Sequence, residues 1–147
     1  MMRMQPLVAS SDAARRDALA GILVHCGLRP LIAISVNGVR TAFALGRVHL
    51  VFCEDELPGG GFRAVMQLAS AAAPAAPVIV CSRCGDLAQY LEAMEMGAFD
   101  FIAPPYRLSE VRFILGRIAE TVLSKTRSTR SSRDAHKECV GEGAVRA

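Results

Sequence analysis

Short apolar runs alternate with amphipathic segments along most of the chain. Between and after the runs, apolar residues recur at the i, i+3, i+4 and i+7 spacing of a helix that lies on a sheet. The runs have the length of strands and cover residues 7–9, 31–34, 48–53, 78–81 and 99–102. Regular alternation of this kind predicts a parallel sheet with helices on both faces.

Caps and glycines place the helices between these strands. The first helix follows Ser10, Ser11 and Asp12, which are all good N-cap residues, and should end at Gly27. The residues expected to face inward are Leu19, Ile22, Leu23 and Cys26 in the first helix, Val39, Ala42, Phe43 and Leu45 in the second, Phe62, Val65, Met66 and Ala69 in the third, Leu87, Leu91 and Met94 in the fourth, and Val111, Ile114, Leu115, Ile118 and Val122 in the last. Because right-handed crossovers leave few topologies, we predict an α/β fold: a doubly wound five-stranded parallel sheet in the order 2-1-3-4-5 with five flanking helices.

Charge separates a body from a tail. The chain has 147 residues and a net charge of +3, but residues 1–124 hold 11 arginines, 11 acidic residues and no lysine. All the excess positive charge therefore falls in residues 125–147, which we predict to be a flexible tail rich in Ser and Arg. A neutral body lacks the clustered basic face that nucleic-acid binding requires, whereas the tail leaves such binding open.

Two classes of protein are disfavoured by the apolar pattern. No run reaches 18 consecutive apolar residues, so we expect no membrane span. The apolar stretch before Ser10 is too short for the hydrophobic region of a secretory signal, so we expect a cytoplasmic protein.

Five cysteines, an odd number, suit a reducing compartment. Cys81 and Cys84 form a CxxC pair, which can be a redox pair or half a zinc site, but no second pair follows at ligand spacing and we expect no metal. A cysteine-based redox or metal-sensing module remains an alternative, with Cys53 on the neighbouring strand. Strand alternation places Cys53 and Cys81 in the helix layers and away from the pocket.

In an open doubly wound sheet, the functional site lies beyond the carboxyl ends of the strands. Polar or turn-forming residues follow four of the five predicted strands. They are Ser10, Ser11 and Asp12 after the first, Glu54 and Asp55 after the third, Ser82 after the fourth, and Pro104 after the fifth.

Three motifs at these places carry a family resemblance: LPGGG at 57–61, PVIVCS at 77–82 and GAFDFIAPPY at 97–106. Residues 6–123 resemble the receiver domain of two-component response regulators. The resemblance implies an acidic pair for Mg²⁺ at Ser10 and Ser11, a phosphoacceptor Asp at Glu54 and a phosphate-contacting Lys at Pro104. All three family residues have been replaced, although a shift of one residue would bring Asp12 within reach of a cation.

The resemblance also implies a switch apparatus. Ser82 matches the family's switch hydroxyl, Phe101 its switch aromatic, and Pro105 a proline whose preceding peptide bond is often cis. Simpler interpretations stand beside these: Glu54 to Glu56 as a solvated turn, Ser10 and Ser11 as helix caps, Ser82 as a strand-end hydroxyl and Phe101 as core.

We therefore expect a degenerate receiver without enzymatic activity and without a cofactor, since two serine hydroxyls in place of carboxylates should weaken Mg²⁺ binding severely. It would act as a protein-interaction module, binding a signalling protein or a second copy through the fourth helix, fifth strand and fifth helix, residues 84–120. The alternatives are a conventional phosphoacceptor using Asp55 or Glu54, and the cysteine-based sensor.

Overall fold

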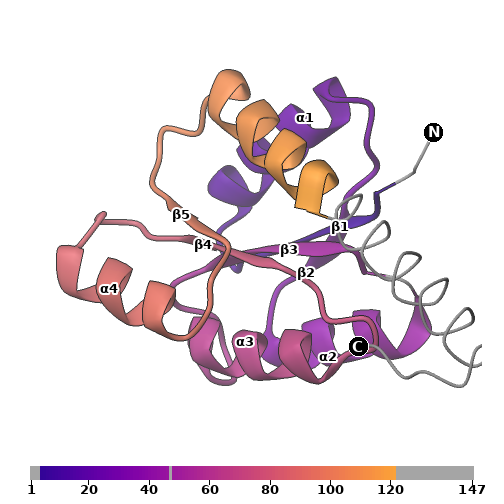
Figure 1. Ribbon diagram of the computed structural model, residues 1–147, viewed down its shortest axis with the longest axis vertical. Coiled ribbons are helices and arrows are strands. Elements are labelled where there is room, and N and C mark those ends of the chain that lie inside the picture. Colours follow the sequence, from indigo (N-terminus) through magenta and orange to yellow (C-terminus); the bar gives the residue numbers. More distant parts are fainter. Residues whose placement is uncertain (1–3, 47, 122–147) are drawn as a thin grey trace, which may run out of the picture. The chain divides into compact units, whose positions relative to one another are not determined.

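The computed structural model describes residues 4–46 and 48–121 (Figure 1). The chain divides into two compact units, Met1–Val111 and Arg112–Ala147, and each is considered by itself. Within the second unit, residues 112–121 continue a helix that begins at residue 108. The predicted tail 125–147 and the predicted inward residue Val122 lie outside the described residues.

The first unit contains a five-stranded parallel sheet in the order β2-β1-β3-β4-β5, which confirms the predicted fold class. The strands are β1 (Pro6–Ala9), β2 (Leu31–Ala33), β3 (Leu50–Glu54), β4 (Val78–Cys81) and β5 (Asp100–Ile102). The helices are α1 (Ala13–His25), α2 (Val36–Leu45), α3 (Gly61–Ala71) and α4 (Leu87–Glu95), followed by the helix over 108–121. Figure 1 shows α1 on one face of the sheet and α2 and α3 on the other.

Alternation along the central strands divides the core between these two faces. Cys53 and Val80 point toward α2 and α3 and join a cluster with Val39 and Phe62. All four residues that we predicted to face inward from α3 are buried. Strand β3 is buried over its full length, as expected for a central parallel strand.

One strand boundary differs from its prediction in a way that matters for the site. The third strand was predicted over 48–53, but it runs from Leu50 to Glu54, and Glu54 pairs in register with Cys81 of β4. The apolar pattern ends at Cys53 because Glu54 is charged, yet the ladder continues for one more residue. Glu54 is therefore held by the sheet and does not lie on a solvated turn.

Several apolar residues of the predicted strands and helices are exposed. Strand β2 is the edge of the sheet, and Ile32 and Ile34 are about half exposed. Leu45, in the last turn of α2, is 83% exposed.

The inward face of α4 was also predicted wrongly. Leu87 is 69% exposed, Leu91 is 53% exposed and Met94 is exposed as well, whereas Ala93 is completely buried. The small Ala93 side chain allows the helix to approach the core closely. The spacing of apolar residues predicted that the large side chains of α4 face the core, but the helix packs through the small side chain of Ala93.

The turn between β3 and α3 depends on glycines with positive φ. Gly61 has φ +70°, and a Cβ added there would lie 3.0 Å from the backbone oxygen of Asp55. A side chain at this position meets both backbone strain and a fixed backbone atom. The turn therefore fixes the distance between Asp55 and the start of α3.

We expect Gly61→Ala to lower the free energy of unfolding by about 1–3 kcal/mol, the cost of a non-glycine residue in a left-handed conformation. Gly21→Ala is the matched control, because Gly21 lies in α1 with nothing within 4 Å of an added Cβ. That change should stabilise the protein by about 0.5–1 kcal/mol through helix propensity. Urea unfolding of both variants tests the pair, and equal midpoints would contradict the prediction.

Candidate functional site

Four buried polar residues gather where the sheet's strands end. In the described part of the chain, the buried polar and charged residues are Ser10, Glu54, Asp55 and Ser82. They come from the ends of β1, β3 and β4, which are neighbours in the sheet. All four were named as site candidates from the sequence. The parallel sheet brings them together because the carboxyl ends of its strands lie at one edge.

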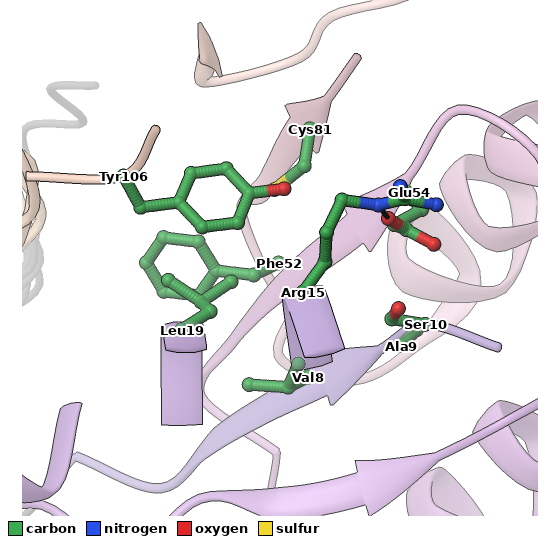
Figure 2. Close-up of a pocket in the computed structure, with 9 residues that line it drawn as sticks. All are labelled: Val8, Ala9, Ser10, Arg15, Leu19, Phe52, Glu54, Cys81 and Tyr106. Atoms are coloured by element: carbon green, nitrogen blue, oxygen red, sulfur yellow. Dashed lines mark hydrogen bonds and ion pairs between the residues drawn. The ribbon is translucent and has the colours of Figure 1, made fainter. Parts of the chain in front are cut away.

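An ion pair between Glu54 and Arg15 occupies the centre of this site (Figure 2). Arg15 lies in the first turn of α1, and its Nε donates to Oε2 of Glu54. The Glu54 carboxylate raises the pKa of Arg15 above its ordinary value. The side chain of Glu54 is only 5% exposed, whereas that of Arg15 is 31% exposed.

Arg15 was not identified from the sequence. A signal was nevertheless present, because a buried carboxylate requires an opposite charge. Residues 1–124 contain no lysine, so that charge had to come from an arginine. What the sequence could not provide was which arginine, because α1 and β3 lie 39 residues apart at this contact.

The segment after β1 uses its polar residues to begin α1. Asp12 is the N-cap, and its Oδ1 accepts from the backbone N–H of Arg15 at 2.8 Å. This hydrogen bond is the main reason that the pKa of Asp12 is lowered. The prediction that Ser10 and Ser11 are the caps is therefore wrong: Ser10 Oγ accepts from the backbone N–H of Asp12 at 3.2 Å, and Ser11 is exposed.

Apolar and aromatic side chains close the space around the ion pair. In Figure 2, Tyr106 points its hydroxyl at the sulfur of Cys81, above Phe52. Burial raises the pKa of both Tyr106 and Cys81. The residues that line this pocket leave no room for a water molecule. They are Val8, Ala9, Ser10, Arg15, Leu19, Phe52, Glu54, Cys81 and Tyr106.

The position of Cys81 corrects one prediction. Cys81 was expected to face away from the pocket, but it pairs in register with Glu54 and lines the same pocket. Cys53 does face away, as predicted, and lies in the core toward α2 and α3. The prediction treated Cys53 and Cys81 as equivalent because each precedes a polar residue. In the sheet, however, Cys53 pairs with Val80 and Cys81 pairs with Glu54, so the two cysteines lie on opposite faces.

Asp55 follows Glu54 but makes different contacts. Its Oδ1 lies 3.4 Å from Nε of Arg83, and its Oδ2 accepts from Nε2 of Gln89 at 3.4 Å. Arg83 also pairs with Glu56, with Nη2 and Oε2 2.9 Å apart. The two carboxylates raise the pKa of Arg83.

The four positions assigned to the switch and the lysine lie along β4, β5 and the segment that follows. Ser82 Oγ accepts from the backbone N–H groups of Cys84 and Gly85, at 3.4 and 3.1 Å, so its hydroxyl shapes the connection to α4. Phe101 is partly buried and meets Tyr90 edge-on, with ring centroids 5.4 Å apart. The peptide bond between Pro104 and Pro105 is cis.

The described residues, 4–46 and 48–121, carry neither a metal-binding cluster nor a membrane-spanning helix. No group of three His, Cys, Asp or Glu side chains there is arranged to hold a metal ion. No helix in that part of the chain is long and apolar enough to cross a membrane.

Known proteins with similar sequences are bacterial response regulators. The DNA-binding transcriptional regulator NtrC of Rhizobium meliloti is 30% identical over 111 residues, which are 76% of this chain and 23% of that protein. The nitrogen assimilation regulatory protein NtrX of Azorhizobium caulinodans is 27% identical over 118 residues, 79% of this chain and 26% of that protein. The chain thus spans about a quarter of the length of the curated relatives it matches.

A solved structure adds a match over a whole domain. The receiver domain of NtrX from Brucella abortus is 26% identical, with a TM-score of 0.71, and the match covers 79% of this chain and 98% of that one. No family model matches the chain. On the support of these relatives and of the shared fold, the described part of the chain is a receiver domain of the response-regulator type.

Proposed function

We propose that this receiver domain has lost phosphoryl transfer and works as a protein-interaction module in two-component signalling. The observation that carries the proposal is the buried ion pair of Glu54 with Arg15. In this proposal Glu54 stands at the phosphoacceptor position, and Arg15 of α1 neutralises its charge. The domain is then a binding element and not an enzyme.

The residues present do not fit the chemistry that the receiver resemblance implies. In-line transfer requires an acceptor oxygen free to attack, with cations that neutralise the phosphoryl oxygens. Here the Glu54 carboxylate is paired with Arg15, and Pro104 offers neither charge nor donor. The side chains packed around the ion pair leave no room there even for a water molecule.

Magnesium does not fit the site either. This cation prefers charged oxygen ligands in octahedral array. Ser10 supplies a neutral hydroxyl that is already bonded to backbone, Ser11 is exposed, and Asp12 caps α1. We therefore propose that the domain functions without Mg²⁺.

The ion pair also supports a fixed conformation. Glu54 is longer than the aspartate of the family, so its charge extends further from β3, toward α1. Arg15 holds that charge in place. In this proposal Glu54 stands in for the phosphorylated side chain, and the domain does not cycle between two states.

The proposed partner surface includes α4. Leu87, Leu91 and Met94 recur at helical spacing and are all exposed, which gives this helix an apolar outer face. Exposed apolar residues gathered on one element are typical of a protein-binding surface. The occupant we propose is a signalling protein or a second copy of the chain, bound through α4, β5 and the helix that begins at residue 108.

The cysteine-based alternative receives less support. Cys81 is buried with a raised pKa, which disfavours the reactive thiolate, whereas Cys84 is exposed. Cys53 points to the other face of the sheet. Nucleic-acid binding through residues 125–147 concerns a segment outside the described residues.

The loss of phosphoryl transfer is tested by intact-mass measurement after incubation with Mg²⁺ and a small phosphodonor. We expect no adduct of about 80 Da, the mass of one phosphoryl group. A related receiver with the full acidic site serves as the positive control for the donor. An acid-anhydride adduct on this chain would refute the proposal, and its loss in Asp55→Asn would assign it to Asp55.

The ion pair is tested by a double-mutant cycle of Arg15→Met and Glu54→Met in urea unfolding. Arg15→Met should cost about 1–3 kcal/mol, because it leaves a buried carboxylate unpaired. The double variant should be more stable than Arg15→Met alone, since both charges are then removed. Strictly additive effects would show that the two side chains do not interact.

The α4 surface is tested by capture of binding proteins from native lysate, with sedimentation to detect a dimer. Leu91→Ser should reduce the bound partner, or the dimer, at least about tenfold, the loss expected for an interface anchor worth more than 1 kcal/mol. Leu45→Ser is the matched control, because Leu45 is also a leucine, on α2, and is more exposed than Leu91. Equal losses in both variants would place the binding surface elsewhere.

A further inference from the structure

Two adjacent carboxylates in this domain serve different elements. Glu54 ends β3 and binds Arg15 of α1. Asp55, one residue later, contacts Arg83 in the connection between β4 and α4, and Gln89 within α4. Successive residues of an extended chain point to opposite sides, which explains why the two side chains diverge.

Two backbone hydrogen bonds hold Asp55 in place, independently of its side chain. Its N–H donates to the carbonyl oxygen of Cys81 at 3.0 Å, and its own carbonyl oxygen accepts from the N–H of Phe62 at 3.3 Å. Asp55 is thus tied to β4 on one side and to α3 on the other. Its side chain is only 6% exposed and presents a negative charge from a rigid position.

The contacts of this carboxylate bracket the first turn of α4. Arg83 precedes the helix by four residues, and Gln89 lies in its first turn. Arg83 is further held by Glu56, at 2.9 Å. Between Arg83 and the helix, the N–H groups of Cys84 and Gly85 donate to the hydroxyl of Ser82, which shapes the rest of the connection.

Helix α4 has few other attachments to the sheet. Ala93 is its buried residue, the ring of Tyr90 meets Phe101 of β5 edge-on, and Arg63 of α3 forms an ion pair with Glu92 near the other end. Both side chains of that ion pair are largely exposed, so solvent screens it. Among the polar contacts of α4, those of Asp55 are therefore the more buried.

We infer that Asp55 is a positioning residue that fixes the start of α4, and with it the exposed face of Leu87 and Leu91, independently of Glu54. The inference rests on the proposed function in so far as that face is the binding surface. Glu54 and Asp55 then hold two different helices, α1 and α4. A change at Glu54 would leave α4 in place, and a change at Asp55 would release it.

The test measures backbone amide hydrogen exchange in the full chain over residues 83–95. Asp55→Asn keeps the shape of the side chain but removes the charge that faces Arg83. We expect exchange in this segment to become faster on the order of threefold to tenfold, the effect of losing one hydrogen bond or ion pair from a local opening equilibrium. Glu54→Gln is the matched control and should leave residues 83–95 unchanged while exchange at the start of α1 increases.

Two further variants distinguish a local effect on α4 from a general loss of stability. Arg83→Gln should reproduce the effect of Asp55→Asn on residues 83–95, and the combined variant should add little, because both changes break the same contact. Arg63→Gln breaks the ion pair of α3 with Glu92 of α4 and should act additively with Asp55→Asn. Unchanged exchange in both Asp55→Asn and Arg83→Gln, or an equal effect of Glu54→Gln, would overturn the inference.

This measurement needs no partner, so its outcome is separate from that of the proposed function. Faster exchange with unchanged partner capture would keep the positioning role and refute α4 as the binding surface. Faster exchange with partner capture lost in both Asp55→Asn and Leu91→Ser would support both.

Discussion

A negative charge at the buried end of a central strand has to be compensated, and in this domain Arg15 compensates it. Glu54 belongs to the hydrogen-bonded ladder of β3, so it cannot move away from the sheet to reach water. Leaving such a carboxylate unpaired would cost about 1–3 kcal/mol, a large fraction of the stability of a typical domain. The position of α1 over the sheet, the capping of that helix by Asp12 and the closure of the pocket by Tyr106 are all consistent with this one requirement.

The residues around the pair show what the site gains and loses by this arrangement. Arg15 neutralises Glu54 from within the chain. The hydroxyls of Ser10 and Ser82 accept hydrogen bonds from nearby backbone N–H groups. The polar side chains of the site thus bind one another and nearby backbone, and the exposed face of α4 is the surface that we propose for partners.

Much of the fold could be predicted from the sequence, because strand and helix periods are local properties of the chain. The sheet order followed from the handedness of crossovers, and the four buried polar residues followed from the rule that strand ends meet at one edge. Arg15 could not be predicted, since its partner is 39 residues away and eleven arginines in residues 1–124 were equivalent by composition. The exposure of Leu87 and Leu91 was also missed, because apolar spacing cannot show that a helix packs through a small residue such as Ala93.

Strand β2 has a consequence for how this domain behaves in concentrated solution. As the outermost strand, β2 is hydrogen bonded to β1 on one side, and its other side is open. Leu31 and Ile32 on this strand are partly exposed. An open, apolar sheet edge is a template on which another chain can add a strand and begin an aggregate. Three residues, Leu31–Ala33, are few for such a template, so the shortness of β2 itself protects the domain from uncontrolled association.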